Sequence, residues 1–91
     1  MDPQTTLAQI GRMTLGGVGA RRFSKTDDSL SFTISRGHRK VTITLEADDT
    51  YTVRTHMIRS GKLVFQSEGI YCDQLADAVW SAHIERDEVT A

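Results

Sequence analysis

The chain has 91 residues and a net charge of −1, with 38% of its residues hydrophobic and 25% charged. These values are typical of one small globular domain with a thin core, and they argue against two separate cores or a disordered chain. The single cysteine, Cys72, excludes an internal disulfide framework and a multi-cysteine zinc site. No apolar stretch approaches the roughly 20 residues of a membrane span, and no signal-peptide pattern opens the sequence. We therefore expect one cytoplasmic domain over residues 1–91, with no contact with a membrane.

The charges are unevenly distributed along this nearly neutral chain. Residues 20–62 carry nine Lys and Arg against five Asp and Glu, a net charge of +4, whereas residues 63–91 carry one Arg against six acids, a net charge of −5. The distribution predicts a basic central segment followed by an acidic C-terminal part.

Residues 1–19 predict a short N-terminal helix followed by a glycine-rich segment. Asp2 is a good helix cap, Pro3 suits the first helical position, and Leu7 and Ile10 follow at helical spacing. The helix is expected to end near Gly11. Residues 15–20 (LGGVGA) lack the Gly-Lys-Ser/Thr ending of a phosphate-binding loop, so we interpret them as a linker or turn.

Residues 20–71 predict an antiparallel meander of four strands, because apolar and polar residues alternate in four segments joined by short turns. The apolar rows begin with Leu30, Phe32 and Ile34 and continue with Val41, Ile43 and Leu45. Serine, threonine, arginine and histidine occupy the alternate positions, which predicts one solvated face. Residues 21–25 are a candidate for a fifth, short strand that Phe23 anchors to the core.

Residues 72–86 predict a C-terminal helix, capped by Asp73 and packed on one face of the sheet. Its apolar arc is widened by Ala76, Trp80 and Ile84, which we expect to pack against the N-terminal helix or to form a self-association or partner interface. Residues 87–91 form an acidic tail. The predicted fold class is therefore α+β: a short N-terminal helix, a four-stranded meander and a C-terminal helix.

No combination of residues predicts an enzyme, a metal site or a cofactor. The histidines His38, His56 and His83 lack the spacing of a metal-binding set. Cys72 stands beside Asp73, which opposes a reactive thiolate. The paired acids at 27–28 and 48–49 lie in expected turns, where aspartate bonds to nearby backbone N–H groups.

The most suggestive polar feature is a set of basic residues around the predicted sheet. Two hairpin turns and the solvated face supply these candidates for nucleic-acid binding: Arg36, Arg39, Lys40, Arg54, His56, Arg59 and Lys62. The aromatic residues of the strands fall in the apolar rows, so the predicted face lacks the stacking platform typical of single-strand binders.

Several stretches resemble a group of short phage proteins. They are residues 7–11, 29–34, 41–45, 49–53, 58–62 and the run Gly-Ile-Tyr-Cys-Asp-Gln-Leu at 69–75. Together these stretches are similar to small proteins encoded by bacteriophages and other mobile elements. The resemblance implies expression in a bacterial cytoplasm and carries no catalytic residue or mechanism.

The predicted order of elements, strands followed by a helix, is also similar to that of Whirly-type single-stranded-DNA binders, which dimerise through their helices. This likeness concerns topology alone. We therefore predict a non-enzymatic protein that binds a host protein or a second copy of itself, with single-stranded DNA or RNA binding as the alternative.

Overall fold

The computed structural model of the chain describes residues 3–34 and 38–84. Its centre is an antiparallel sheet of five strands in sequence order, β1 to β5. Their bounds are β1 Arg21–Lys25, β2 Ser29–Ile34, β3 Arg39–Leu45, β4 Tyr51–Met57 and β5 Leu63–Ile70. The α+β class and the antiparallel sheet are confirmed, but four strands is too few, since residues 21–25 form a full edge strand.

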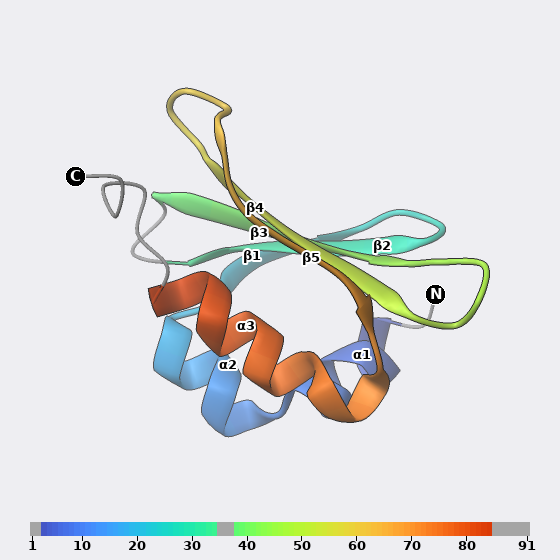
Figure 1. Ribbon diagram of the computed structural model, residues 1–91. Coiled ribbons are helices and arrows are strands. Elements are labelled where there is room, and N and C mark those ends of the chain that lie inside the picture. Colours follow the sequence, from blue (N-terminus) through green and yellow to red (C-terminus); the bar gives the residue numbers. More distant parts are fainter. Residues whose placement is uncertain (1–2, 35–37, 85–91) are drawn as a thin grey trace.

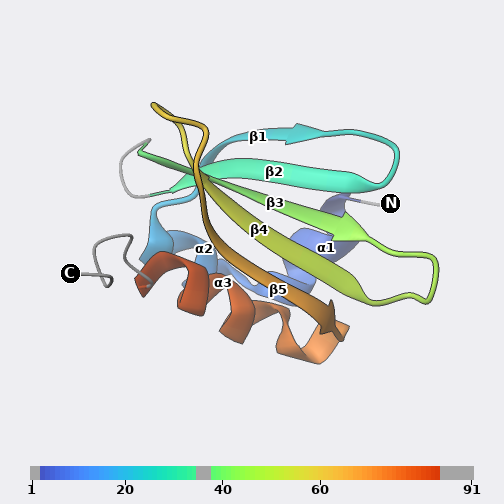
Figure 2. The same ribbon diagram turned by 45° about the horizontal axis from the view of Figure 1, so that its top comes forward.

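All helices lie on the same face of the sheet, and the other face is open (Figures 1 and 2). The helices are α1 Pro3–Ile10, α2 Arg12–Val18 and α3 Leu75–Ile84, and a short 3-10 helix, η2 Cys72–Gln74, leads into α3. α3 contacts α1, α2, β4 and β5. The C-terminal helix therefore packs both on the sheet and on the N-terminal helices.

The core fills the space between the sheet and the helices. Strand pairing aligns Leu30 with Ile43, and Ile43 with Val53, in one row of the inner face. The helices add their own buried side chains: Ile10, Val18, Leu75, Ala78 and Val79. Full burial of one large apolar side chain contributes about 1.5–3 kcal/mol, so these rows are the main source of stability.

The glycine-rich segment is a helix and not a linker, which corrects the sequence-based expectation. Gly11, at φ 93°, separates α1 from α2, and Gly19, at φ 69°, ends α2 in the left-handed conformation. The N–H of Gly19 donates to the carbonyl of Gly16, and that of Ala20 to the carbonyl of Leu15. This is the Schellman pattern of a helix C-terminus. Glycine content suggested a loop, but positive φ requires glycine only at Gly11 and Gly19, which flank α2.

The start of the C-terminal helix also differs from the expectation that Asp73 caps it. The N–H of Tyr71 donates to Oε1 of Gln74 at 3.2 Å, and the N–H of Gln74 donates to the carbonyl of Tyr71 at 2.8 Å. Asp73 lies inside the first turn of η2. The predicted helix residues 85 and 86 and the acidic tail 87–91 lie outside the described residues.

Both edges of the sheet are irregular. β1 changes register against β2 between Arg21 and Ser24, and Arg22 has φ 58°. β5 has one residue more than β4 at each of its two register shifts. Such bulges protect a sheet edge from pairing with another strand.

Phe23 anchors β1 less deeply than the sequence suggested. Its ring is 47% exposed, although it packs at 5.5 Å between centroids on the buried ring of Phe32. The neighbouring residues of β1 are also exposed.

Candidate functional site on the open face of the sheet

The open face carries the polar row that the sequence predicted. Strand pairing sets Lys40 beside His56, Thr42 beside Arg54, and Thr44 beside Thr52. Alternate residues of a strand point to opposite faces, so these six side chains lie on the face away from the helices. β5 extends the row through Gln66, which pairs with Arg54.

Basic residues gather at one end of this face, which we call the basic end: Lys40, His56, Arg59 and Lys62. Lys40 and His56 are adjacent in neighbouring strands, and Arg59 and Lys62 belong to the turn between β4 and β5. The structure therefore brings together four of the seven predicted nucleic-acid contacts.

The remaining predicted contacts lie elsewhere. Arg39 pairs with Ile34 and Met57, in the row of the helix-covered face, and it is half-buried. It therefore does not extend the basic end across the open face. Arg36 lies outside the described residues. Arg54 lies mid-strand, two residue pairs further from the β4–β5 hairpin than His56.

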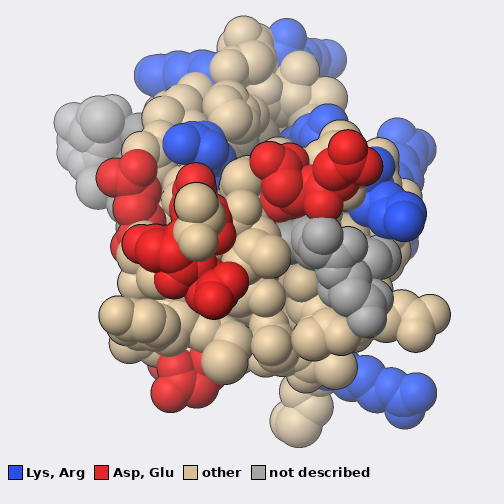
Figure 3. All heavy atoms as spheres, turned by 90° about the vertical axis from the view of Figure 1, so that its right-hand side faces the viewer, with Lys and Arg blue, Asp and Glu red and all other residues tan. Residues whose placement is uncertain are grey.

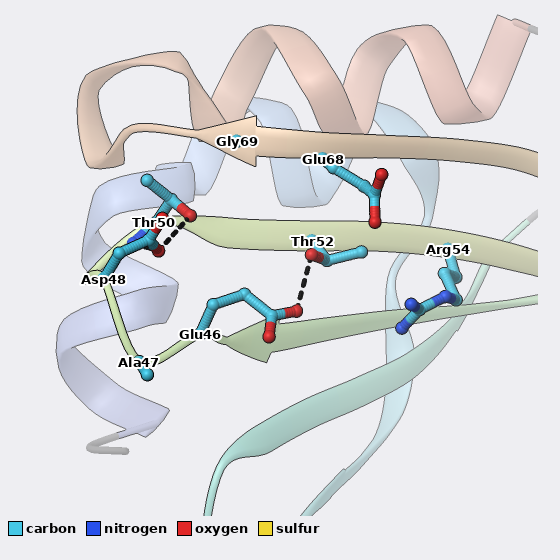
Figure 4. A pocket seen from close by; sticks show the side chains of 8 residues that line it. All are labelled: Glu46, Ala47, Asp48, Thr50, Thr52, Arg54, Glu68 and Gly69. Atoms are coloured by element: carbon cyan, nitrogen blue, oxygen red, sulfur yellow. Dashed lines mark hydrogen bonds between the residues drawn. The ribbon is translucent and has the colours of Figure 1, made fainter.

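The opposite end of the open face is acidic, which the sequence analysis did not anticipate. A hollow of about 620 Å³ lies there, lined by Glu46, Ala47, Asp48, Thr50, Thr52, Arg54, Glu68 and Gly69 (Figure 4). Figure 3 views the end of the molecule at the right of Figure 1, where acidic side chains gather and basic ones lie mostly around them. The open face is thus polarised along its strands and is not uniformly basic.

Hydrogen bonds hold two of the carboxylates in the hollow. The hydroxyl of Thr52, a residue only 2% exposed, donates to Oε2 of Glu46 at 2.6 Å. The hydroxyl of Thr50 donates to Oδ1 of Asp48 at 2.6 Å, and the Thr50 N–H donates to the same oxygen at 3.2 Å. These bonds from Thr50 hold the pKa of Asp48 below its ordinary value, because they favour the charged carboxylate.

Arg54 stands between the hollow and the basic end. Its Nε donates to Oε1 of Gln66 at 3.2 Å, and Figure 4 shows its guanidinium apart from the carboxylates of Glu46 and Glu68. Within the described part of the chain, Arg54 makes no ion pair with Glu46 or Glu68. Its terminal N–H groups are available to an acceptor from outside.

An exposed apolar pair lies beside the basic end. The hairpin between β4 and β5 rises above the sheet at the top left of Figure 1. At its tip Ile58 is 47% exposed and Leu63 is 45% exposed, next to a hollow of about 380 Å³ lined by His38, Met57, Ile58 and Arg59. We call Ile58, Arg59, Lys62 and Leu63 the hairpin tip.

Sequence reasoning did not single out this apolar pair. The sequence did contain one sign of it. Ile58 follows Thr52, Arg54 and His56 in the series of alternate positions, and it is the apolar member of a series that is otherwise polar. A single exposed isoleucine is ordinary on a protein surface, so only its neighbour Leu63, which the fold brings to the same hairpin, makes it part of an apolar pair.

The interface predicted on the C-terminal helix is partly used within the chain. The ring of Trp80 lies against Gly17 of α2 and is 39% exposed, and Ala76 is half-buried. The sequence left two alternatives for the apolar arc of this helix, packing on an N-terminal helix or an interface with a partner. The contact of Trp80 with Gly17 is of the first kind. Ile84 is the last residue of α3, and its side chain lies outside the described part of the structure.

Comparisons of the chain with protein-family models, curated proteins and solved structures found no match. Among the described residues, no three His, Cys, Asp or Glu side chains are grouped so that they could hold a metal ion. None of the helices over residues 3–34 and 38–84 is long and apolar enough to cross a membrane.

Proposed function

We propose that this protein is a non-enzymatic binding protein that docks an acidic protein surface on its hairpin tip and the adjoining basic end. The observation that carries the proposal is the exposed pair Ile58 and Leu63, flanked by Arg59 and Lys62. An apolar centre with a charged rim is the usual composition of a protein-binding patch.

Shape and charge both support this surface. The hairpin rises above the sheet, so its tip can enter a partner without a clash from the helices (Figure 1). Two cations at the tip, with Lys40 and His56 behind them, select a partner of opposite charge and accelerate its encounter. The resemblance to phage proteins adds the setting, a bacterial cytoplasm with a host protein as the partner.

The test compares capture from bacterial lysate by the wild type, by the tip variant Ile58→Ser/Leu63→Ser, and by a control variant, Met13→Ser. Met13 is 90% exposed, so its replacement removes a similar apolar group from a remote surface. The captured protein is then purified and titrated against all three chains. We expect tight binding by the wild type and Met13→Ser, and at least a tenfold loss for the tip variant.

Charge provides the second arm of this test. Arg59→Glu should weaken binding of the purified partner and reduce the salt dependence of its association rate. Equal affinity of the wild type and the tip variant for the captured protein, or a wild type that binds no lysate protein, would refute the proposal.

Nucleic-acid binding remains the second candidate, favoured by the Lys and Arg side chains of the basic end and the available N–H groups of Arg54. The acidic hollow at the other end of the face opposes it, since Glu46 and Glu68 repel a phosphate backbone that follows the strands. Fluorescence anisotropy of a labelled single-stranded oligonucleotide at low and high salt tests it. Salt-dependent binding that Lys40→Glu abolishes would favour this second function.

A further inference from the structure

The two edges of the sheet differ in charge and shape in a way that makes them complementary. The β1 edge presents Arg21, Arg22 and Lys25 around the half-exposed ring of Phe23. All five residues of β1 are exposed, and within the described part of the chain these three cations form no ion pair. This edge is therefore a basic strip with one half-exposed aromatic side chain, whose ring also packs on Phe32.

The β5 edge borders a groove with one carboxylate, that of Asp77, in its lining. Between β5 and α3 lies a hollow of about 410 Å³ lined by Phe65, Gln66, Ser67, Ile70, Gln74, Asp77, Ala78 and Ser81. Its apolar side consists of Phe65, Ile70 and Ala78, and Asp77 is its charged lining residue. Glu68 and Asp73 are exposed in the adjoining segments.

We infer that the β5–α3 groove binds the β1 edge of a second copy of this chain. The exposed part of the Phe23 ring would cover the apolar side of the groove, and Arg22 would pair with Asp77. Among the described residues, no basic side chain lines the groove, so a cation from a second copy can pair with Asp77. This contact uses surfaces other than the hairpin tip and is independent of the proposed function.

Side-chain docking suits these edges better than a continuous hydrogen-bonded sheet. The bulges of β1 and β5 interrupt the regular ladder that a strand-to-strand junction would need. The contact joins different surfaces of identical chains. It is therefore head-to-tail and does not close on two copies, so assembly grows with concentration.

Sedimentation velocity of the full chain tests this inference with two complementary variants. Asp77→Lys reverses the charge of the groove, and Arg22→Ser/Phe23→Ser removes the cation and ring of the β1 edge. The wild type should form species beyond dimers at low salt and fewer at high salt. Each variant alone should remain monomeric, because each has lost one half of the contact.

An equimolar mixture of the two variants retains one intact edge on each partner. It should therefore form a dimer and stop there, with the mass approaching twice that of the monomer. Lys40→Glu, on the open face, is the control and should assemble as the wild type does. Far-ultraviolet circular dichroism confirms that each variant is folded.

Three results would overturn the inference. They are a wild type that stays monomeric throughout, a wild type that stops at a dimer, and a mixture of variants that remains monomeric. Loss of association in Lys40→Glu would place the contact on the open face and would also overturn it.

Discussion

The ring of Trp80 occupies the space that a side chain at Gly17 would need. A Cβ at Gly17 would lie 2.5 Å from Cη2 and 2.7 Å from Cζ2 of Trp80. The backbone of α2 thereby packs directly on the ring of an α3 side chain. This contact joins the two helices that the sequence places 57 or more residues apart, and it explains why glycine persists inside a helix.

Gly17→Ala should lower the free energy of unfolding by about 1–2 kcal/mol, because the new methyl group displaces the ring of Trp80. Urea denaturation measures the loss. Trp80 is the only tryptophan, so its emission should also shift to longer wavelength as the ring becomes more exposed.

Gly16→Ala is the matched control for this change. A Cβ at Gly16 meets nothing within 4 Å. The same substitution should then raise the free energy of unfolding by about 0.5–1 kcal/mol through helix propensity. Equal effects of the two substitutions would show that the ring does not constrain position 17.

A second expectation concerns Thr55, which lies in the core with its hydroxyl unpaired. The residue is fully buried, and its Oγ1 has no hydrogen-bond partner among the residues that the structure describes. Thr55→Val keeps the shape and removes the desolvated hydroxyl, so we expect the free energy of unfolding to rise by about 1–2 kcal/mol. Thermal and urea denaturation measure the gain.

Thr33→Val serves as the comparison, because the Thr33 hydroxyl donates to the carbonyl of Arg21 at 3.1 Å. Loss of this hydrogen bond should leave the free energy of unfolding unchanged or lower it by about 0.5–1.5 kcal/mol. If Thr55→Val also destabilises the protein, the hydroxyl has a partner in solution, such as a buried water.

The alternation of residues predicted the sheet well because period 2 is a direct consequence of strand geometry. Leu30, Phe32, Val41, Ile43 and Val53 were placed on the buried face from the sequence, and all are 2% exposed or less. Glycine content was a poorer guide. It suggested a linker at 11–19, where the tertiary contact of Gly17 with Trp80 in fact favours a helix.

The candidate site was predicted only in part. The sequence indicates which residues lie on the open face, but it does not show at which end of that face each of them lies. His56 was expected on the open face and lies there, beside Lys40, which was expected at a hairpin turn. Glu46 and Glu68 belong to separate strands or turns, and only the pairing of the strands brings them to one hollow. The acidic end could not be derived from local sequence.

A third expectation concerns the link between α1 and the sheet. The hydroxyl of Tyr51, a residue 7% exposed, donates to Oε1 of Gln9 at 2.9 Å. Tyr51→Phe should therefore lower the free energy of unfolding by about 0.5–1.5 kcal/mol. Hydrogen exchange should show faster opening of α1.

Tyr71→Phe is the control for this substitution, because Tyr71 is 60% exposed and lies outside the contact between α1 and the sheet. It should leave both measurements unchanged. A Tyr51→Phe variant as stable as the wild type, with α1 equally protected, would show that packing alone holds this helix.

The last expectation concerns the pH dependence of Asp48 in the acidic hollow. Hydrogen bonds from the hydroxyl and N–H of Thr50 lower the pKa of this carboxyl from its ordinary value of 3.8. A carboxyl whose pKa is lower in the folded state stabilises the fold above its unfolded pKa. That contribution is lost as the pH falls through the folded pKa. Because Asp48 is exposed, the effect on stability should be small, and the pKa itself is the better measurement.

Thr50→Val removes the hydroxyl that makes the larger contribution, so the pKa of Asp48 should rise toward its ordinary value. Thr50→Ser keeps a hydroxyl at the same position and should keep the pKa low. Carboxyl carbon chemical shifts followed by NMR between neutral and acidic pH give both values. A pKa that rises equally in the two variants would mean that the methyl group of Thr50, and not its hydroxyl, maintains the turn around Asp48.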